Sequence, residues 1–115
     1  MIEDKNANIL DKYDYERFSL KYTVDLASRI KQKFENIPII FNIKGQNGNY
    51  TTVFSSNSFD CIGLDFNVNE EEVVRLANKN NKVIFGNMDL SILSGNKEHI
   101  RKKTEIMLNQ FKKTK

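Results

Sequence analysis

Four side chains able to contact a ligand stand directly after short apolar runs of the sequence: Lys44, Asp65, Asn87 and Asp89. If these runs are parallel strands, their carboxyl ends converge on one mouth, which is where α/β folds bind ligands. Asp65 and Asp89 could form a carboxylate pair there, although no metal site is expected from them. Helix caps and turns use the same residue types, so a structural role stays open for each of the four.

The first element that the sequence predicts is a helix over about 12–34. Asp11 is placed to cap its amino end, because the carboxylate can accept the free amide hydrogens of the first turn. Apolar residues recur every three or four positions and predict one buried face. They are Tyr15, Phe18, Tyr22, Leu26, Ile30 and Phe34.

Three apolar runs follow and indicate strands, at 37–41, 61–64 and 83–85. Between the first two lie an expected loop at 44–48 and a weak helical turn at about 50–55. Asn69, with Glu72 three positions later, is typical of a capped helix start. A last helix is expected from about Lys97, after Asn96.

Strands that alternate with helices pair in parallel through crossover connections, which are nearly always right-handed. The sequence therefore predicts an α/β fold with about three parallel strands, as a small open sheet or a partial TIM-like (β/α) barrel. A complete eight-stranded barrel needs roughly 250 residues, and this chain has 115. No linker or repeat divides it, so residues 1–115 are expected to form a single partial domain.

Composition narrows the functional classes. The formal charge of +3 comes from basic residues interleaved with acidic ones, so nucleic acid is not expected as a partner. No apolar stretch approaches the ~20 residues of a membrane span, and the first residues do not resemble a signal peptide. The single cysteine, Cys61, excludes an intramolecular disulfide. A cytoplasmic location is expected, and a plastid location stays open if an N-terminal part is missing.

Three segments resemble the uroporphyrinogen decarboxylase family, in its order and at nearly its spacing. YERFSLKY at 15–22, followed by PIIFNIKG, is similar to a helix and a strand that ends in a lysine-glycine turn. FDCIGLDFNVNEEE is similar to the family's strand ending in Gly-Leu-Asp-Trp, with Phe66 in place of the tryptophan. KVIFGNMDLSIL is similar to the family's Gln-Gly-Asn-(Leu/Met)-Asp-Pro signature.

The resemblance implies a cofactor-free lyase on a distorted β/α barrel. That enzyme removes carbon dioxide from the four acetate side chains of uroporphyrinogen and yields coproporphyrinogen, on the way to haem. The substrate is a polyanion, so its cleft needs cations, an acid for the pyrrole carbons and a carboxylate that stabilises positive charge on the ring.

The resemblance also assigns residues. Lys44, Asn87, Asp89 and Lys5 are expected to bind substrate, and Asp65 and Gly86 to shape the rim. No catalytic residue is assigned, because the family's arginine-rich segment, its key aspartate and its substrate-contacting tyrosine lie upstream. Its histidine-containing loop would follow the last matched helix, after Lys115.

Two signature positions depart from the family pattern. The family's Phe-Asp-Ser strand end falls on Glu3-Asp4-Lys5, so Lys5 stands where a substrate-contacting serine is expected. Leu90 replaces the signature proline. Neither the single histidine, His99, nor Cys61 is expected to act: His99 is predicted at the surface and Cys61 as a buried, inert thiol. No metal or other cofactor is expected.

Two hypotheses follow. In the first, the chain is the C-terminal part of a uroporphyrinogen decarboxylase, inactive alone, whose partner is a porphyrinogen once the enzyme is complete. In the second, it is a degenerate, non-catalytic protein or a partner-docking module. Open sheet edges favour association in both cases, with a second copy or with a complementing barrel fragment.

Overall fold

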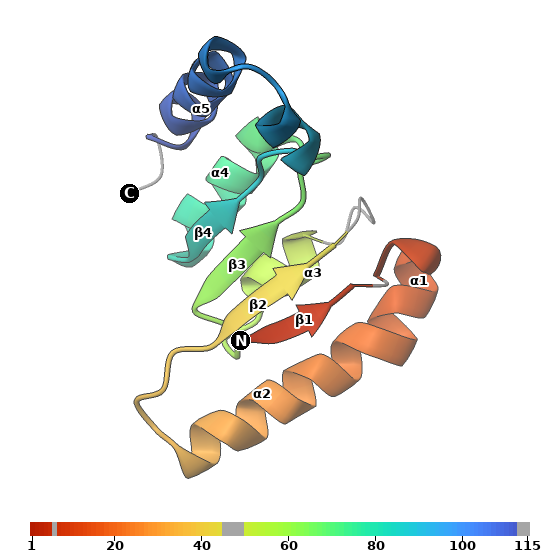
Figure 1. Cartoon of the computed structure of the whole chain (residues 1–115). Coiled ribbons are helices and arrows are strands. Elements are labelled where there is room, and N and C mark those ends of the chain that lie inside the picture. The colour runs from red at the N-terminus through yellow and green to blue at the C-terminus, as the bar shows by residue number, and fades with distance from the viewer. Residues whose placement is uncertain (6, 45–49, 113–115) are drawn as a thin grey trace.

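The computed structural model describes residues 1–5, 7–44 and 50–112. They form one sheet of four parallel strands in the order β1-β2-β3-β4 (Figure 1). The strands are β1 (Ile2–Asp4), β2 (Ile40–Ile43), β3 (Cys61–Leu64) and β4 (Val83–Gly86). The α/β class and the partial-barrel architecture are thus confirmed, and the sheet is not closed.

The strand count is a correction to the sequence-based expectation of about three. The additional strand, β1, has only three residues, of which Glu3 and Asp4 are charged. It therefore lacks the apolar run that marks a buried strand. Only the resemblance pointed to a strand end there. The strand expected at 37–41 begins later, at Ile40, and Pro38 lies outside it.

The chain runs from β1 through a short 3-10 turn, η1 (Ala7–Ile9), into one long helical segment. This segment comprises α1 (Lys12–Tyr15), the π-helical turn η2 (Glu16–Leu20) and α2 (Lys21–Lys33). The helix α3 (Tyr50–Ser55) follows β2, and α4 (Glu70–Asn80) follows β3. After β4 come the 3-10 helix η3 (Leu90–Ser94) and α5 (Lys97–Phe111).

The three predicted caps are confirmed. Asp11 accepts a hydrogen bond from the Asp14 amide at 2.9 Å, Asn69 from Glu72 at 3.1 Å, and Asn96 from His99 at 2.9 Å. Each side chain satisfies one amide that the first helical turn leaves free. These helix starts are therefore encoded locally.

The core lies between the helices and one face of the sheet. Alternate residues of β2 and β3 supply its sheet side, among them Phe41, Ile43 and Ile62. The helices contribute buried side chains such as Tyr15, Ala27, Val53, Phe54, Val73 and Leu76. The opposite face carries the row Glu3, Asn42, Gly63 and Phe85, which the strand register aligns.

The predicted buried face of the first helix is partly wrong. Tyr15 is fully buried and Ile30 packs against the core, whereas Phe18, Tyr22, Leu26 and Phe34 are exposed. The face that meets the sheet carries Leu20, Val24 and the small Ala27 instead. The π-helical turn adds a residue to the helix, and this shifts its faces relative to a regular 3.6-residue pattern.

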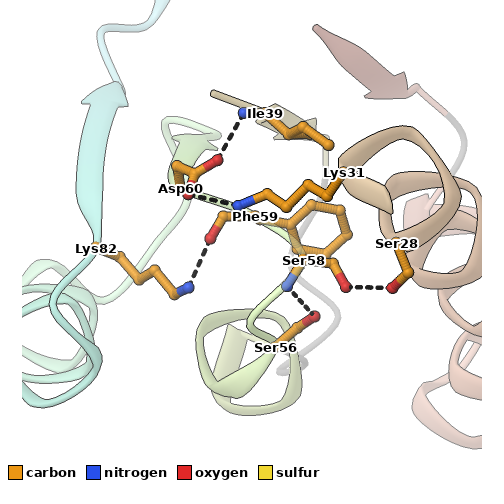
Figure 2. Close-up of polar contacts among 8 residues, drawn as sticks. All are labelled: Ser28, Lys31, Ile39, Ser56, Ser58, Phe59, Asp60 and Lys82. Atoms are coloured by element: carbon orange, nitrogen blue, oxygen red, sulfur yellow. Dashed lines mark hydrogen bonds and ion pairs between the residues drawn. The ribbon is translucent and has the colours of Figure 1, made fainter. Parts of the chain in front are cut away.

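The amino ends of the strands are joined by a polar network (Figure 2). Asp60 accepts the Ile39 amide hydrogen and pairs with Lys31 of α2, both at 2.7 Å. Lys82 donates to the Phe59 carbonyl at 2.6 Å. This network lies at the end of the sheet opposite to the residues predicted to bind a ligand, so it serves the fold rather than a site.

Candidate functional site

The predicted site residues gather at the carboxyl ends of the strands. One position beyond the paired rows, Lys5 follows β1, Lys44 follows β2, Asp65 follows β3 and Asn87 follows β4. They line a surface depression of about 380 Å³ together with Asp89 and Gly86. The structure thus brings together all six residues that the sequence singled out, although their roles stay predictions.

The two lysines differ in their electrostatic surroundings. Lys5 forms an ion pair with Glu3 at 3.2 Å, and this hydrogen bond, then its charge, lowers the pKa of the Glu3 carboxyl. Lys44 takes part in none of the three ion pairs found among the described residues. Its backbone amide is held by the Asp4 carbonyl at 3.0 Å. The charge of Lys44 also lowers the pKa of Glu3, but less than Lys5 does, so Lys44 is the cation at this mouth with more of its charge available to a ligand.

The carboxylates of Asp65 and Asp89 each accept a hydrogen bond from a nearby backbone amide. Asp65 accepts a hydrogen bond from the Phe66 amide at 2.8 Å. Asp89 caps η3 by accepting the Ser91 amide hydrogen, also at 2.8 Å. Both side chains therefore support local turns at the ends of β3 and β4. The rim role expected for Asp65 and the ligand contact expected for Asp89 stay predictions.

Asn87 is the buried member of the group. Its amide nitrogen donates to the Glu70 carboxylate at the start of α4, over 3.3 Å. It also lines a neighbouring depression of about 290 Å³ between α4, η3 and α5, which contains Met107 and Lys103. Asn87 therefore joins the mouth to the helical layer and is a less accessible ligand contact than Lys44.

The backbone conformation at position 86 requires a glycine. Its φ is +96°, and a Cβ built on it would lie 2.7 Å from the Leu64 carbonyl oxygen. Only glycine adopts such a conformation at this close approach without strain. Gly86 thus turns the chain at the end of β4 and sets the direction of Asn87 and Asp89.

Two buried tyrosines lie close to this row: the sequence predicted the burial of Tyr15 but gave it no place near the site, and it missed the burial of Tyr50. The hydroxyls of Tyr15 and Tyr50 are buried and have no hydrogen-bond partner among the described residues. Burial raises the pKa of Tyr50 to about 12; the backbone of Asp65 partly offsets this increase, and the charge of Asp65 adds to it. Burial, then the charge of Asp4, raises the pKa of Tyr15 as well. Both hydroxyls therefore stay protonated at neutral pH. In the sequence, nothing about these two aromatic residues indicated that they lie close to the mouth.

Other candidate chemistry is weak. Cys61 is half-buried on the open face of the sheet rather than fully buried, and burial, then the charge of Asp60, raises the pKa of its thiol. His99 is exposed at the start of α5, as expected.

Within residues 1–5, 7–44 and 50–112, no three His, Cys, Asp or Glu side chains cluster closely enough to hold a metal ion. In the same residues, no helix combines the length and the apolar composition of a membrane span.

The geometry can be compared with known proteins. Residues 1–115 match the family model described as "Uroporphyrinogen decarboxylase (URO-D)". The chain belongs to this family. The uroporphyrinogen decarboxylase signature segments at 63–66 and 86–89 lie at the carboxyl ends of the neighbouring strands β3 and β4, which explains why they approach one mouth.

Individual uroporphyrinogen decarboxylases are similar over most of the chain. The protein named uroporphyrinogen decarboxylase from Francisella tularensis subsp. novicida is 38% identical over 101 residues, covering 88% of this chain and 28% of that protein. The one from Schizosaccharomyces pombe is 30% identical over 115 residues, covering 96% and 32%. The chain thus spans about a third or less of these curated relatives. No solved structure matches it.

Proposed function

We propose that this chain forms one wall of the substrate mouth of a uroporphyrinogen decarboxylase and needs other segments for catalysis. The reaction is the conversion of uroporphyrinogen to coproporphyrinogen through loss of carbon dioxide from the acetate side chains. The observation that carries the proposal is the pair Lys5 and Lys44 beside one depression at the carboxyl ends of parallel strands, in a member of this family.

The role of the wall is electrostatic. Uroporphyrinogen carries many carboxylates, and a lysine ammonium can meet one through a charge-assisted hydrogen bond. Lys44 is best placed for this contact, because the charge of Lys5 is already shared with Glu3. Asn87 and Asp89 hold the rim on which the substrate would rest. The acid that protonates the pyrrole carbons and the carboxylate that stabilises ring charge are assigned to other segments of a complete barrel.

The test measures binding of uroporphyrinogen to the 115-residue chain by titration calorimetry under anaerobic conditions. We expect Lys44→Ala to weaken binding about tenfold, since one charge-assisted hydrogen bond contributes about 1.5 kcal/mol. Lys5→Ala is expected to weaken binding less. Lys102→Ala is the matched control, because Lys102 is exposed on α5 and does not line the mouth. Equal affinity of wild type and Lys44→Ala would refute the role of Lys44.

The alternative is a non-catalytic derivative of the family. The observation in its favour is Lys5 at the position of the expected serine, where it is engaged by Glu3. A chimera decides between the two: these 115 residues replace the matching segment of the Francisella tularensis protein, and coproporphyrinogen formation is measured. Conversion supports the decarboxylase, whereas a folded chimera without conversion supports the derivative. The cytoplasmic location stays a prediction.

A further inference from the structure

The two lysines of the mouth are both attached to Asp4. Lys5 follows Asp4 directly in the chain, and the backbone amide of Lys44 donates to the Asp4 carbonyl at 3.0 Å. This hydrogen bond closes the pairing of β1 with β2, which ends with Asp4 beside Ile43. The position of Asp4 therefore sets where both lysines leave the sheet.

The side chain of Asp4 is directed away from the mouth. Successive side chains of a strand point to opposite faces, and Glu3 lies in the row on the open face, so Asp4 points toward the helices, as the buried Ile43 does. The mouth depression is lined by both lysines and, among the described residues, not by Asp4. Asp4 instead lines a separate depression of about 290 Å³ between β1, η1 and η2, together with Ser19. It is therefore not placed to touch a ligand in the mouth.

The Asp4 carboxylate is held by a side chain from the π-helical turn η2. The hydroxyl of Ser19 in this turn donates to a carboxylate oxygen of Asp4. Asp4 is partly buried, so it depends on protein donors where water does not reach it, and a hydrogen bond to an ionised acceptor is stronger than one between neutral groups. A π turn inside an α-helix is rare and occurs frequently at functional sites. This turn supplies the donor that fixes the end of β1.

The turn η2 also contacts α3, the next helix in the chain after Lys44. The Thr52 hydroxyl of α3 donates to the Glu16 carboxylate of η2 at 2.8 Å. Side chains of this single turn therefore bond to the end of β1, which carries Lys5, and to the helix that follows the Lys44 position. Of these two bonds, the one from Ser19 is the less exposed to water.

We propose that Ser19 is a positioning residue for Lys44: its hydrogen bond fixes Asp4, and the Asp4 carbonyl fixes the backbone from which Lys44 reaches the mouth. A long lysine side chain loses rotamer freedom when it binds a carboxylate, and a fixed backbone confines that loss to the side chain. The inference rests on the proposed function for the identity of the ligand, whereas the coupling of Ser19 to the Lys44 backbone can be measured without any ligand.

The first experiment measures amide hydrogen exchange of the 115-residue chain without ligand. We expect Ser19→Ala to speed exchange of the Lys44 amide about tenfold relative to the amides of β3, because the end of β1 opens more often. Ser19→Thr keeps the hydroxyl and should restore the wild-type rate. Ser28→Ala is the matched control: its hydroxyl also bonds between elements, to Ser58 at 2.8 Å, but on the amino side of β3. It should leave the Lys44 rate unchanged.

A second variant covers the case in which Ser19→Ala loses the circular dichroism of the fold. Asp4→Asn keeps the shape of the side chain and weakens the same bond by removing its charge. It should speed exchange of the Lys44 amide in the same direction, to a smaller extent.

The second experiment is a double-mutant cycle with uroporphyrinogen, measured by anaerobic titration calorimetry. We expect Ser19→Ala to weaken binding about threefold, and the double variant with Lys44→Ala to bind no more weakly than Lys44→Ala alone, since Ser19 acts through Lys44. Ser28→Ala should bind like the wild type.

Three results would overturn the positioning role. They are an unchanged Lys44 exchange rate in Ser19→Ala and Asp4→Asn, an equal acceleration at Lys44 and in β3, which would indicate lower stability alone, and losses of affinity that add in the double variant. A wild type that does not bind uroporphyrinogen would refute the proposed function instead, and the exchange rates would still decide whether Ser19 positions Lys44.

Discussion

At the scale of single residues, Gly86 and Lys44 show two different ways of building the mouth. Gly86 acts through its backbone, whose positive φ turns the chain beneath the Leu64 carbonyl. Lys44 acts through its charge, which none of the ion pairs among the described residues neutralises. We expect replacement of Gly86 to change stability, and we propose that replacement of Lys44 changes ligand binding.

Gly86→Ala is expected to destabilise the fold by about 3 kcal/mol, because the added Cβ meets the Leu64 oxygen and the positive φ disfavours a side chain. Urea unfolding measures the difference. Gly95→Ala is the control: its φ is −81° and an added Cβ would lie 3.0 Å from the Ile92 oxygen, so the cost there should be smaller because the backbone conformation suits a side chain. A decrease in the free energy of unfolding below about 1 kcal/mol for Gly86→Ala would show that the turn adjusts to the added Cβ at little energetic cost.

At the scale of elements, the structure depends on how α2 is tied to the segments that precede β2 and β3. Lys31 reaches from α2 to Asp60, and Asp60 also holds the amide of Ile39 (Figure 2). The helix and two strands are therefore tied at the amino end of the sheet. This arrangement leaves the carboxyl end free of structural ion pairs except Glu3–Lys5 among the described residues.

Asp60→Asn tests this tie. Burial opposes ionisation of Asp60, but the hydrogen bonds from Ile39 and Lys31 outweigh it and hold its pKa below the ordinary 3.8. A lowered pKa in the folded state stabilises the fold above pH ~4 and stops doing so as pH falls through the folded value. We expect the variant to lose about 1 kcal/mol at pH 7, a modest figure because the side chain is partly exposed.

The pH dependence of unfolding supplies the check. The difference between wild type and Asp60→Asn should shrink as the pH falls below ~4. Asp25→Asn is the control, because Asp25 pairs with Arg29 on an exposed helical surface and should cost only about 0.3 kcal/mol. A difference that stays constant down to pH 2 would mean that the charge of Asp60 contributes nothing.

At the scale of the whole molecule, the partial barrel explains why so many apolar side chains are exposed. Phe18, Tyr22 and Leu26 on one helical segment, and Val83 and Phe85 on the edge strand β4, are all exposed. Burial of apolar surface stabilises by about 25 cal/mol per Å², so covering these side chains with further strands or helices would stabilise the fold.

The sequence by itself determined the elements with strong local signals. The caps at Asp11, Asn69 and Asn96 and the apolar runs of β3 and β4 are short-range features, and the structure confirms them. The membership of the uroporphyrinogen decarboxylase family also followed from residues 63–66 and 86–89. Because polar residues after parallel strands share one edge, the placement of Lys44, Asp65, Asn87 and Asp89 at the mouth was predictable from the order of the elements, whereas Lys5 followed only from the resemblance.

Only the tertiary structure decided which surfaces are covered. The strand β1 is defined by its pairing with β2, since Glu3 and Asp4 give no apolar signal. The buried side of α2 depends on the π-helical turn at Glu16–Leu20 and on the close packing of Ala27. The Lys31–Asp60 pair joins residues that are 29 positions apart in the chain, and the burial of the Tyr15 and Tyr50 hydroxyls depends on the elements packed around them. Packing and electrostatics of this kind depend on three-dimensional neighbours, which residue spacing does not specify.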